Sequence, residues 1–226
     1  MKKILIITGI IILLVLIFII NLPAEINERE GQENIKKQLF RSLSGLDDGP
    51  GYEIPEGNTV DTAGWLEYKS SYLPTSFLYP PTMTVDRRDS SPYVRNPAET
   101  SFIAAADNNS GIGFTIIKLQ PGDNLDQTII KQVFNESSGR FNSLTEYVSS
   151  SYFNTPPQEV SYAGLSGYSI SINSFNRFAN VFLLDQENKV VYWFDVWLRS
   201  PVKSNLENSG ALSTLSGILH SLKTSD

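Results

Sequence analysis

A continuous apolar segment close to the N-terminus limits the folds open to this chain more than any other feature. Residues 4–20 carry no charge, and among them only Thr8 and Gly9 are not large apolar residues. A helix over this segment would be roughly 25 Å long, near the lower limit for crossing a bilayer. A helix buried in a soluble core needs polar residues on at least one face, and this segment has no such face. We therefore predict that residues 1–23 form a membrane anchor that contacts the lipid bilayer through residues 4–20.

The residues that flank this segment predict its orientation. Lys2 and Lys3 precede it, whereas acidic residues follow it within residues 25–30. Because basic residues favour the cytoplasmic side, we expect a single-pass protein of the cell membrane, with its N-terminus cytoplasmic and its C-terminal domain extracytoplasmic. The segment exceeds the roughly 7–15 apolar residues of a cleavable signal peptide, and Leu22 lies where a cleavage site before Ala24 would need a small residue. An uncleaved signal-anchor is favoured over a cleaved signal peptide.

The charge balance and the absence of cysteine exclude several classes of function. The chain holds 24 acidic and 18 basic residues, for a net charge of −6. Nucleic-acid binding needs clustered lysine and arginine, so no nucleic-acid partner is expected. Without cysteine there can be no disulfide, no thiolate metal site, no cysteine nucleophile and no lipoprotein anchor. The folded part must therefore be held together by its core alone.

A linker is predicted between the anchor and the folded domain. Residues 24–44 have the apolar spacing of an amphipathic helix among glutamate, lysine and glutamine, as in a solvated stalk. Residues 44–51 then combine glycine, aspartate and proline, which end a helix. We assign residues 24–63 to the stalk helix and a flexible spacer. Residues 64–226 form the extracytoplasmic domain.

Short apolar segments separated by turn residues predict an α+β fold for this domain. Strand Lys189–Leu198 places Tyr192 and Phe194 on one face and Trp193 and Trp197 on the other, with Asp195 between the two tryptophans. A strand with large apolar side chains on both faces is covered on both sides. We predict a mostly antiparallel sheet of about five to seven strands with helices packed on both faces, an α/β/α sandwich.

The individual elements follow from alternation, helical spacing and capping. Ser143 and Glu146 form a capping box that begins one helix. The other predicted helices are Asn124–Phe134 and Leu212–Leu222. The predicted strands are Trp65–Tyr68, Phe77–Tyr79, Met83–Val85, Ser101–Ala106, Ile112–Leu119, Glu159–Tyr162, Tyr168–Asn173, Phe178–Asp185 and Lys189–Leu198.

Several of these segments resemble bacterial PsbP-like domains. Trp65 and Tyr68 match the aromatic opening strand, and residues 76–81 (SFLYPP) match the signature segment that follows it. Residues 160–168 match a strand–glycine–strand element, and residues 218–223 (ILHSLK) match the closing helix. The resemblance covers nearly the whole domain. It implies an α/β/α sandwich around an antiparallel sheet, but little about function, because most bacterial members have no assigned role.

We find no complete catalytic or metal-binding motif in the sequence. His220 is the only histidine, and we expect it on the polar face of the last helix. Ser200 and Lys203 fit the motif S-x-x-K, but the sequence lacks the companion motifs of the serine hydrolases that use it. Residues 111–113 (GIG) lack the third glycine of a dinucleotide fingerprint and read as a turn entering a strand. Residues 107–111 are a hairpin turn, which is favoured over a calcium loop because the later glutamate is absent.

One group of residues remains as a candidate surface for a ligand or partner: Tyr192, Trp193, Asp195 and Trp197. A carboxylate between two tryptophans needs a charged partner such as Arg177, Arg199 or a lysine if it is covered. An ion pair at the margin of the sheet is favoured over a functional role for Asp195. We expect a membrane-tethered accessory or binding module without catalytic activity, cofactor or metal, which has a protein partner at the membrane surface. The alternative is a small-ligand-binding or weakly hydrolytic domain with its pocket at this group.

Overall fold

In a computed structural model, part of the chain is placed well enough to describe. The described residues are 54, 60–89, 91, 94, 97–105, 110–136, 138–150, 156–174, 177–198 and 210–224. All of them belong to one compact unit, Asp48–Asp226. Among them, no helix is both long enough and apolar enough to span a bilayer.

Several predictions concern residues outside this part of the chain. The anchor in residues 1–23 and the stalk helix in residues 24–44 lie outside the described residues, as do residues 106–109 of the hairpin turn. The Ser200–Lys203 motif and Arg199 also lie outside them. These predictions therefore remain predictions.

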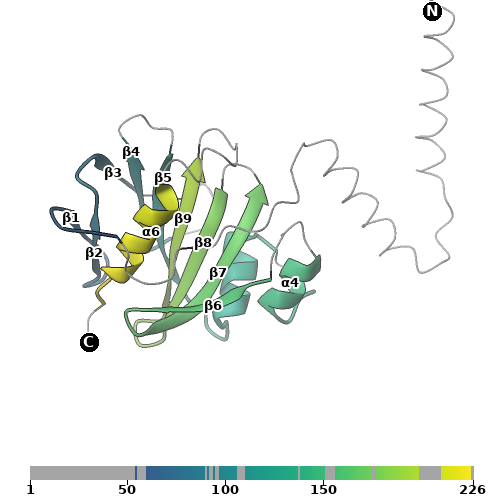
Figure 1. The fold of residues 1–226 in the computed structure, drawn as a ribbon. Coiled ribbons are helices and arrows are strands. Elements are labelled where there is room, and N and C mark those ends of the chain that lie inside the picture. The colour runs from purple at the N-terminus through teal and green to yellow at the C-terminus, as the bar shows by residue number, and fades with distance from the viewer. Residues whose placement is uncertain are drawn as a thin grey trace, which may run out of the picture. The chain divides into compact units, whose positions relative to one another are not determined.

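A twisted antiparallel sheet forms the centre of the described unit (Figure 1). Its seven described strands lie in the order β3-β4-β5-β9-β8-β7-β6, and each pairs antiparallel with its neighbours. The mostly antiparallel sheet expected from the sequence is thereby confirmed. The strands are β3 (Met83–Arg88), β4 (Glu99–Ala105), β5 (Ser110–Lys118), β6 (Gln158–Tyr162), β7 (Leu165–Ser174), β8 (Arg177–Asp185) and β9 (Val190–Leu198).

A separate two-stranded sheet packs beside it. Strands β1 (Leu66–Lys69) and β2 (Ser76–Tyr79) form an antiparallel hairpin. The C-terminal segment joins this hairpin, because Ser76 and Lys223 exchange two backbone hydrogen bonds of 3.0 and 2.8 Å. The closing segment of the chain is thus fixed to one of its first strands.

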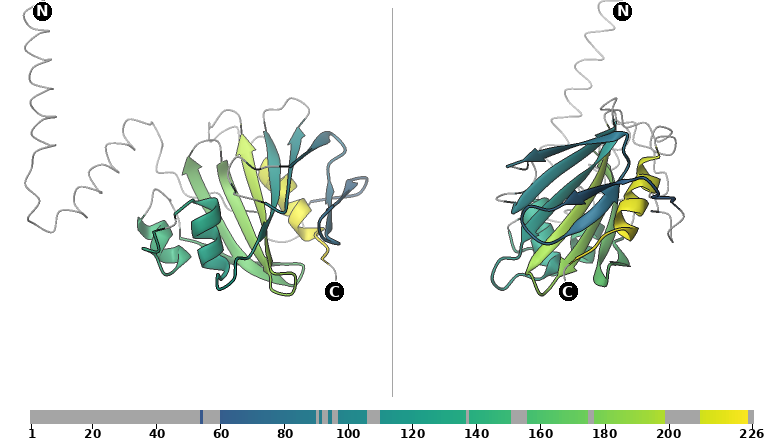
Figure 2. Two further views of the ribbon diagram at one scale, coloured as in Figure 1. Left: turned by 180° about the vertical axis from the view of Figure 1, so that it is seen from behind. Right: turned by 90° about the vertical axis from the view of Figure 1, so that its left-hand side faces the viewer.

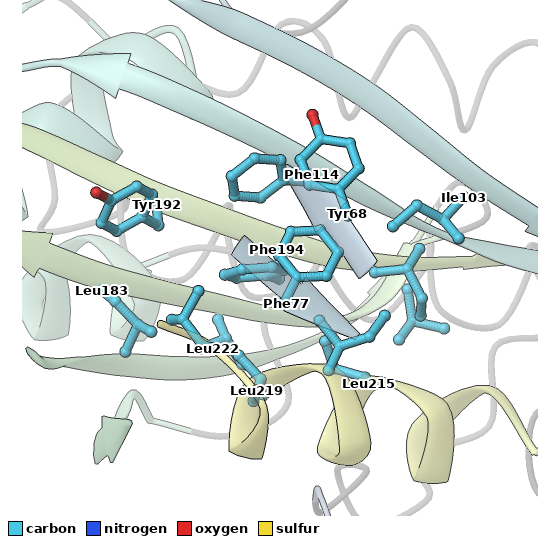
Figure 3. Packing of buried hydrophobic residues seen from close by; sticks show 14 of the residues in the cluster. Tyr68, Phe77, Ile103, Phe114, Leu183, Tyr192, Phe194, Leu215, Leu219 and Leu222 are labelled. Carbon is cyan, nitrogen blue, oxygen red and sulfur yellow. The ribbon is translucent and has the colours of Figure 1, made fainter. Parts of the chain in front are cut away.

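One face of the large sheet is covered by helix α6 (Ala211–His220) and by the β1–β2 hairpin. Figure 3 shows Leu215 and Leu219 of α6 on the side of the helix that faces the aromatic side chains of this cluster. Phe77 meets Phe114 and Phe194 edge to face, with ring centroids 5.2 and 5.7 Å apart. Such pairs stabilise a core beyond the area that they bury. We call this side the α6 face.

The opposite face is covered by three short helices: α3 (Leu125–Thr128), η1 (Ile129–Val133) and α4 (Leu144–Ser150). Figures 1 and 2 show α6 and these helices on opposite sides of the sheet. Trp193 and Phe182 lie fully buried under the three helices. We call this side the α3 face. Both faces of the sheet are covered, as the apolar residues on both sides of β9 predicted.

The helix predicted for Asn124–Phe134 changes its winding midway. Asn124 caps it, because its Oδ1 accepts the Gln127 N–H at 2.9 Å. From Ile129 onward it is a π-helix, and the Phe134 N–H reaches back five residues to the Ile129 carbonyl. A π turn contains more residues than an α turn. Here the adjacent Ile129 and Ile130 are both buried.

The capping box at α4 is present, with one bond displaced. The Ser143 hydroxyl accepts the Glu146 N–H at 3.2 Å, as predicted. The Glu146 carboxylate, however, accepts the N–H of Asn142 at 2.8 Å, one residue earlier than in the standard motif. The Leu144 N–H at the start of this helix donates a hydrogen bond to Oδ2 of Asp126 in α3, at 2.9 Å. A carboxylate from another helix therefore shares in capping α4.

Candidate functional site

The structure separates Tyr192 from the rest of the candidate surface predicted from the sequence. Tyr192 lies on the α6 face, fully buried among the core residues of Figure 3. Its hydroxyl is 2.9 Å from Thr75 Oγ1 and donates to Asp185 Oδ2 at 3.1 Å. Burial raises its pKa to about 12. Its hydrogen bonds are thus made inside the core.

Trp193 and Asp195 lie together on the α3 face, as the alternation predicted. The Trp193 ring stacks on Phe182 with centroids 5.8 Å apart, and its Nε1 donates to Asn180 Oδ1 at 3.0 Å. Trp193 is 0% exposed and Asp195 is 2% exposed. A ligand would have to displace packed side chains to touch either residue.

Two glycines of β5 leave space for the side chains of Asp195 and Trp197. A Cβ on Gly113 would lie 2.1 Å from Asp195 Oδ1, and one on Gly111 would lie 2.6 Å from the Trp197 ring. The register pairs Gly113 with Asp195 and Gly111 with Trp197. The glycines predicted to form a turn are therefore inside β5. A Cβ at Gly113 would require the Asp195 side chain to move, and one at Gly111 would require the Trp197 ring and the Ile103 carbonyl to move.

A second site lies at the outer end of the α3 face. An open groove of about 760 Å³ separates the start of α3 from strands β6 and β7. The pairing of Glu159 with Tyr168 and of Ser161 with Ser166 puts these side chains on one face of the sheet. The groove is lined by Asn124, Leu125, Asp126, Glu159, Val160, Ser161, Ser166, Gly167, Tyr168 and Leu184.

The groove carries negative charge. Asp126 accepts a hydrogen bond from the Leu144 N–H. Burial, and then the carboxylates of Asp126 and Glu159, raise the pKa of Tyr168 above its ordinary value. Of the described residues that line the groove, none carries a positive charge. The site is therefore suited to a cationic ligand or partner.

Another carboxylate, Glu99 of β4, has a different environment. It is 8% exposed and accepts hydrogen bonds from the hydroxyls of Tyr68, Ser70 and Ser71. The N–H groups of Ser71 and Tyr72 donate to it as well, at 2.8 and 3.0 Å. Burial alone would raise the pKa of Glu99, but the hydrogen bonds outweigh it and lower the pKa. Four of these bonds converge on Oε2, so Glu99 fixes the β1–β2 loop to the sheet.

The groove residues were not singled out from the sequence. Asp126 lies in a helix and Glu159 in a short strand, and nothing in the chain marks them as neighbours. The one sequence feature that could have indicated the groove is the acidic side chain of Glu159 in a predicted strand. The described part of the chain holds no cluster of three or more His, Asp or Glu side chains that could share a metal ion.

The chain was compared with known proteins. No protein-family model matches it, and no curated protein sequence matches it. Among solved structures, it is similar to cyanobacterial PsbP (CyanoP) from Synechocystis sp. PCC 6803, determined in solution, at 12% identity. That match covers 76% of this chain and 99% of the other, with a TM-score of 0.45.

Proposed function

We propose that this chain is a membrane-tethered, extracytoplasmic accessory module that binds a protein partner at the membrane surface. Residues 4–20 support the tether, because they are apolar without interruption and lie between two lysines and an acidic stretch. The segments shared with PsbP-like domains support placing residues 64–226 in that structural group. The binding surface in this proposal is the groove between α3 and β6–β7.

The observation that carries the proposal is the contrast between the groove and the rest of the sheet. Both faces of the central strands are filled by close-packed side chains, whereas the groove is open and exposes Glu159. Concave surfaces that combine apolar lining with a few polar groups are the usual binding sites of proteins. Leu125 and Leu184 supply apolar lining here, and Asp126 and Glu159 supply charge.

Crosslinking in intact membranes tests this proposal. The full chain would be crosslinked to its neighbours in cells that express it, isolated, and its partners identified by mass spectrometry. Glu159→Lys replaces the exposed negative charge of the groove with a positive one, and Glu187→Lys makes the same change in the exposed turn between β8 and β9. The proposal predicts a partner that is lost with Glu159→Lys and kept with Glu187→Lys. If both variants still crosslink to the partner, the binding surface is not the groove.

A further inference from the structure

On the basis of the proposed function, we infer that the partner presents an extended peptide segment with alternating basic and apolar side chains. This segment pairs with β6 as a further strand of the sheet and places its basic side chains in the groove. Three features of the described residues lead to this inference: an open strand edge, the charge of the groove, and the alternation of side chains along β6.

Strand β6 is an edge of the sheet. In the described sheet it pairs with β7 on one side and with no strand on the other. A free edge offers backbone N–H and C=O groups to an incoming strand, a common mode of peptide recognition. Within β6 only Glu159 is charged, and the strand has neither lysine nor proline.

The other edge of the sheet, β3, is protected. It carries Asp86, Arg87 and Arg88 in succession. The Arg87 guanidinium donates to the Lys69 carbonyl of the neighbouring hairpin at 2.6 Å, and Arg88 pairs with Asp86 at 2.9 Å. Charged side chains at an edge oppose the addition of a strand. An added strand is therefore favoured at β6.

The two faces of β6 define the side chains of the added strand. Glu159 and Ser161 face the groove, so side chains next to them enter a negatively charged site. Val160 and Tyr162 alternate with them and pack against the α6-face core, although Val160 also borders the groove. The Tyr162 ring is 5.3 Å from that of His220. Because successive side chains of a strand alternate between faces, basic residues must alternate with apolar ones.

The test uses the full chain in neutral detergent and a fluorescently labelled octapeptide of alternating lysine and valine. A second peptide replaces each lysine with glutamate. Two further peptides carry N-methyl groups on alternate amides, so that each has only one edge able to donate hydrogen bonds. Glu159→Gln removes the charge of Glu159 with little change in the size of the side chain, and Glu187→Gln is the matched control. Binding is measured by fluorescence anisotropy, and circular dichroism confirms that each variant is folded.

The inference predicts saturable binding of the lysine peptide, about three- to tenfold weaker for Glu159→Gln and unchanged for Glu187→Gln. The glutamate peptide should bind at least about tenfold more weakly. One N-methylated peptide should lose binding and the other should keep it, because only one peptide edge pairs with β6. The inference is overturned if the lysine peptide does not bind, if both N-methylated peptides bind as well as the parent, or if both glutamine variants behave alike. These results would not overturn the proposed function by themselves. The proposed function would still be supported if the crosslink to a partner in intact membranes depends on Glu159.

Discussion

Carboxylates have different roles in this domain according to what surrounds each one. Glu99 is enclosed by hydroxyl and amide donors, and Asp195 lies in the space that Gly113 leaves open. Asp126 caps a neighbouring helix at the rim of a groove. Of these four carboxylates, only Glu159 is fully exposed to solvent. Its accessibility, more than its charge, makes it the residue for a partner to contact.

The pH dependence of stability tests the role of Glu99. Its pKa in the fold is below the ordinary value of about 4.5, so the ionised carboxylate stabilises the fold above that pH. This contribution is lost as the pH falls through the lowered pKa. We expect Glu99→Gln to be less stable than the parent at pH 7 and to lose less stability on acidification. Denaturant unfolding between pH 7 and pH 3 measures both effects. Glu187→Gln is the control, and an identical pH profile for Glu99→Gln and the parent would exclude this role.

Secondary-structure elements were predictable where their patterns are local. The alternation along β9 predicted which side chains lie on each face, and the Ser143–Glu146 spacing predicted the start of α4. The π turn at Ile129 was not predictable, because it depends on how the helix lies against the sheet. The groove was not predictable either, since Asp126 and Glu159 are far apart in sequence and line the same groove only because the start of α3 lies beside β6 and β7.

The start of α4 can be tested with single substitutions. Ser143→Ala removes the acceptor of the Glu146 N–H, and Glu146→Ala removes the acceptor of the Asn142 N–H. Each should lower the free energy of unfolding by about 0.5–2 kcal/mol. Thr145→Ala, at an exposed position of the same helix, should have little effect. Equal unfolding midpoints for all three variants and the parent would show that these caps contribute nothing.

The three-layer arrangement can be tested with two neighbouring residues of β9. Trp193 and Phe194 are both fully buried but belong to opposite faces of the sheet. Replacing either with alanine should therefore cost about 3–5 kcal/mol in denaturant unfolding. Leu66→Ala, at an exposed position, should cost well under about 1 kcal/mol. If only one of the two buried substitutions is severe, then one face of the sheet is not core.

At the scale of the whole molecule, we expect the tether and the binding site to be separable. The described unit has its own core on both faces of the sheet. The apolar segment in residues 4–20 supplies membrane affinity in our proposal.

Deleting residues 1–23 should therefore release a folded, soluble, monomeric domain. The measurement is fractionation of cells that express the full or the truncated chain, followed by a high-salt wash of the membranes. The full chain should stay with the membranes, and the truncated chain should be found in the soluble fraction with an unchanged circular dichroism spectrum. Membrane association of the truncated chain after the wash would contradict a single N-terminal tether.

The most direct test of the central claim is crosslinking from one position in the groove. A photoreactive amino acid at Ser161, on the groove face of β6, would be compared with one at Glu187 in intact cells. The account predicts a protein adduct from position 161 that is absent from position 187, and that disappears when Glu159→Lys is added. Identical adducts from both positions, or none from position 161, would contradict a binding site at this edge of the sheet.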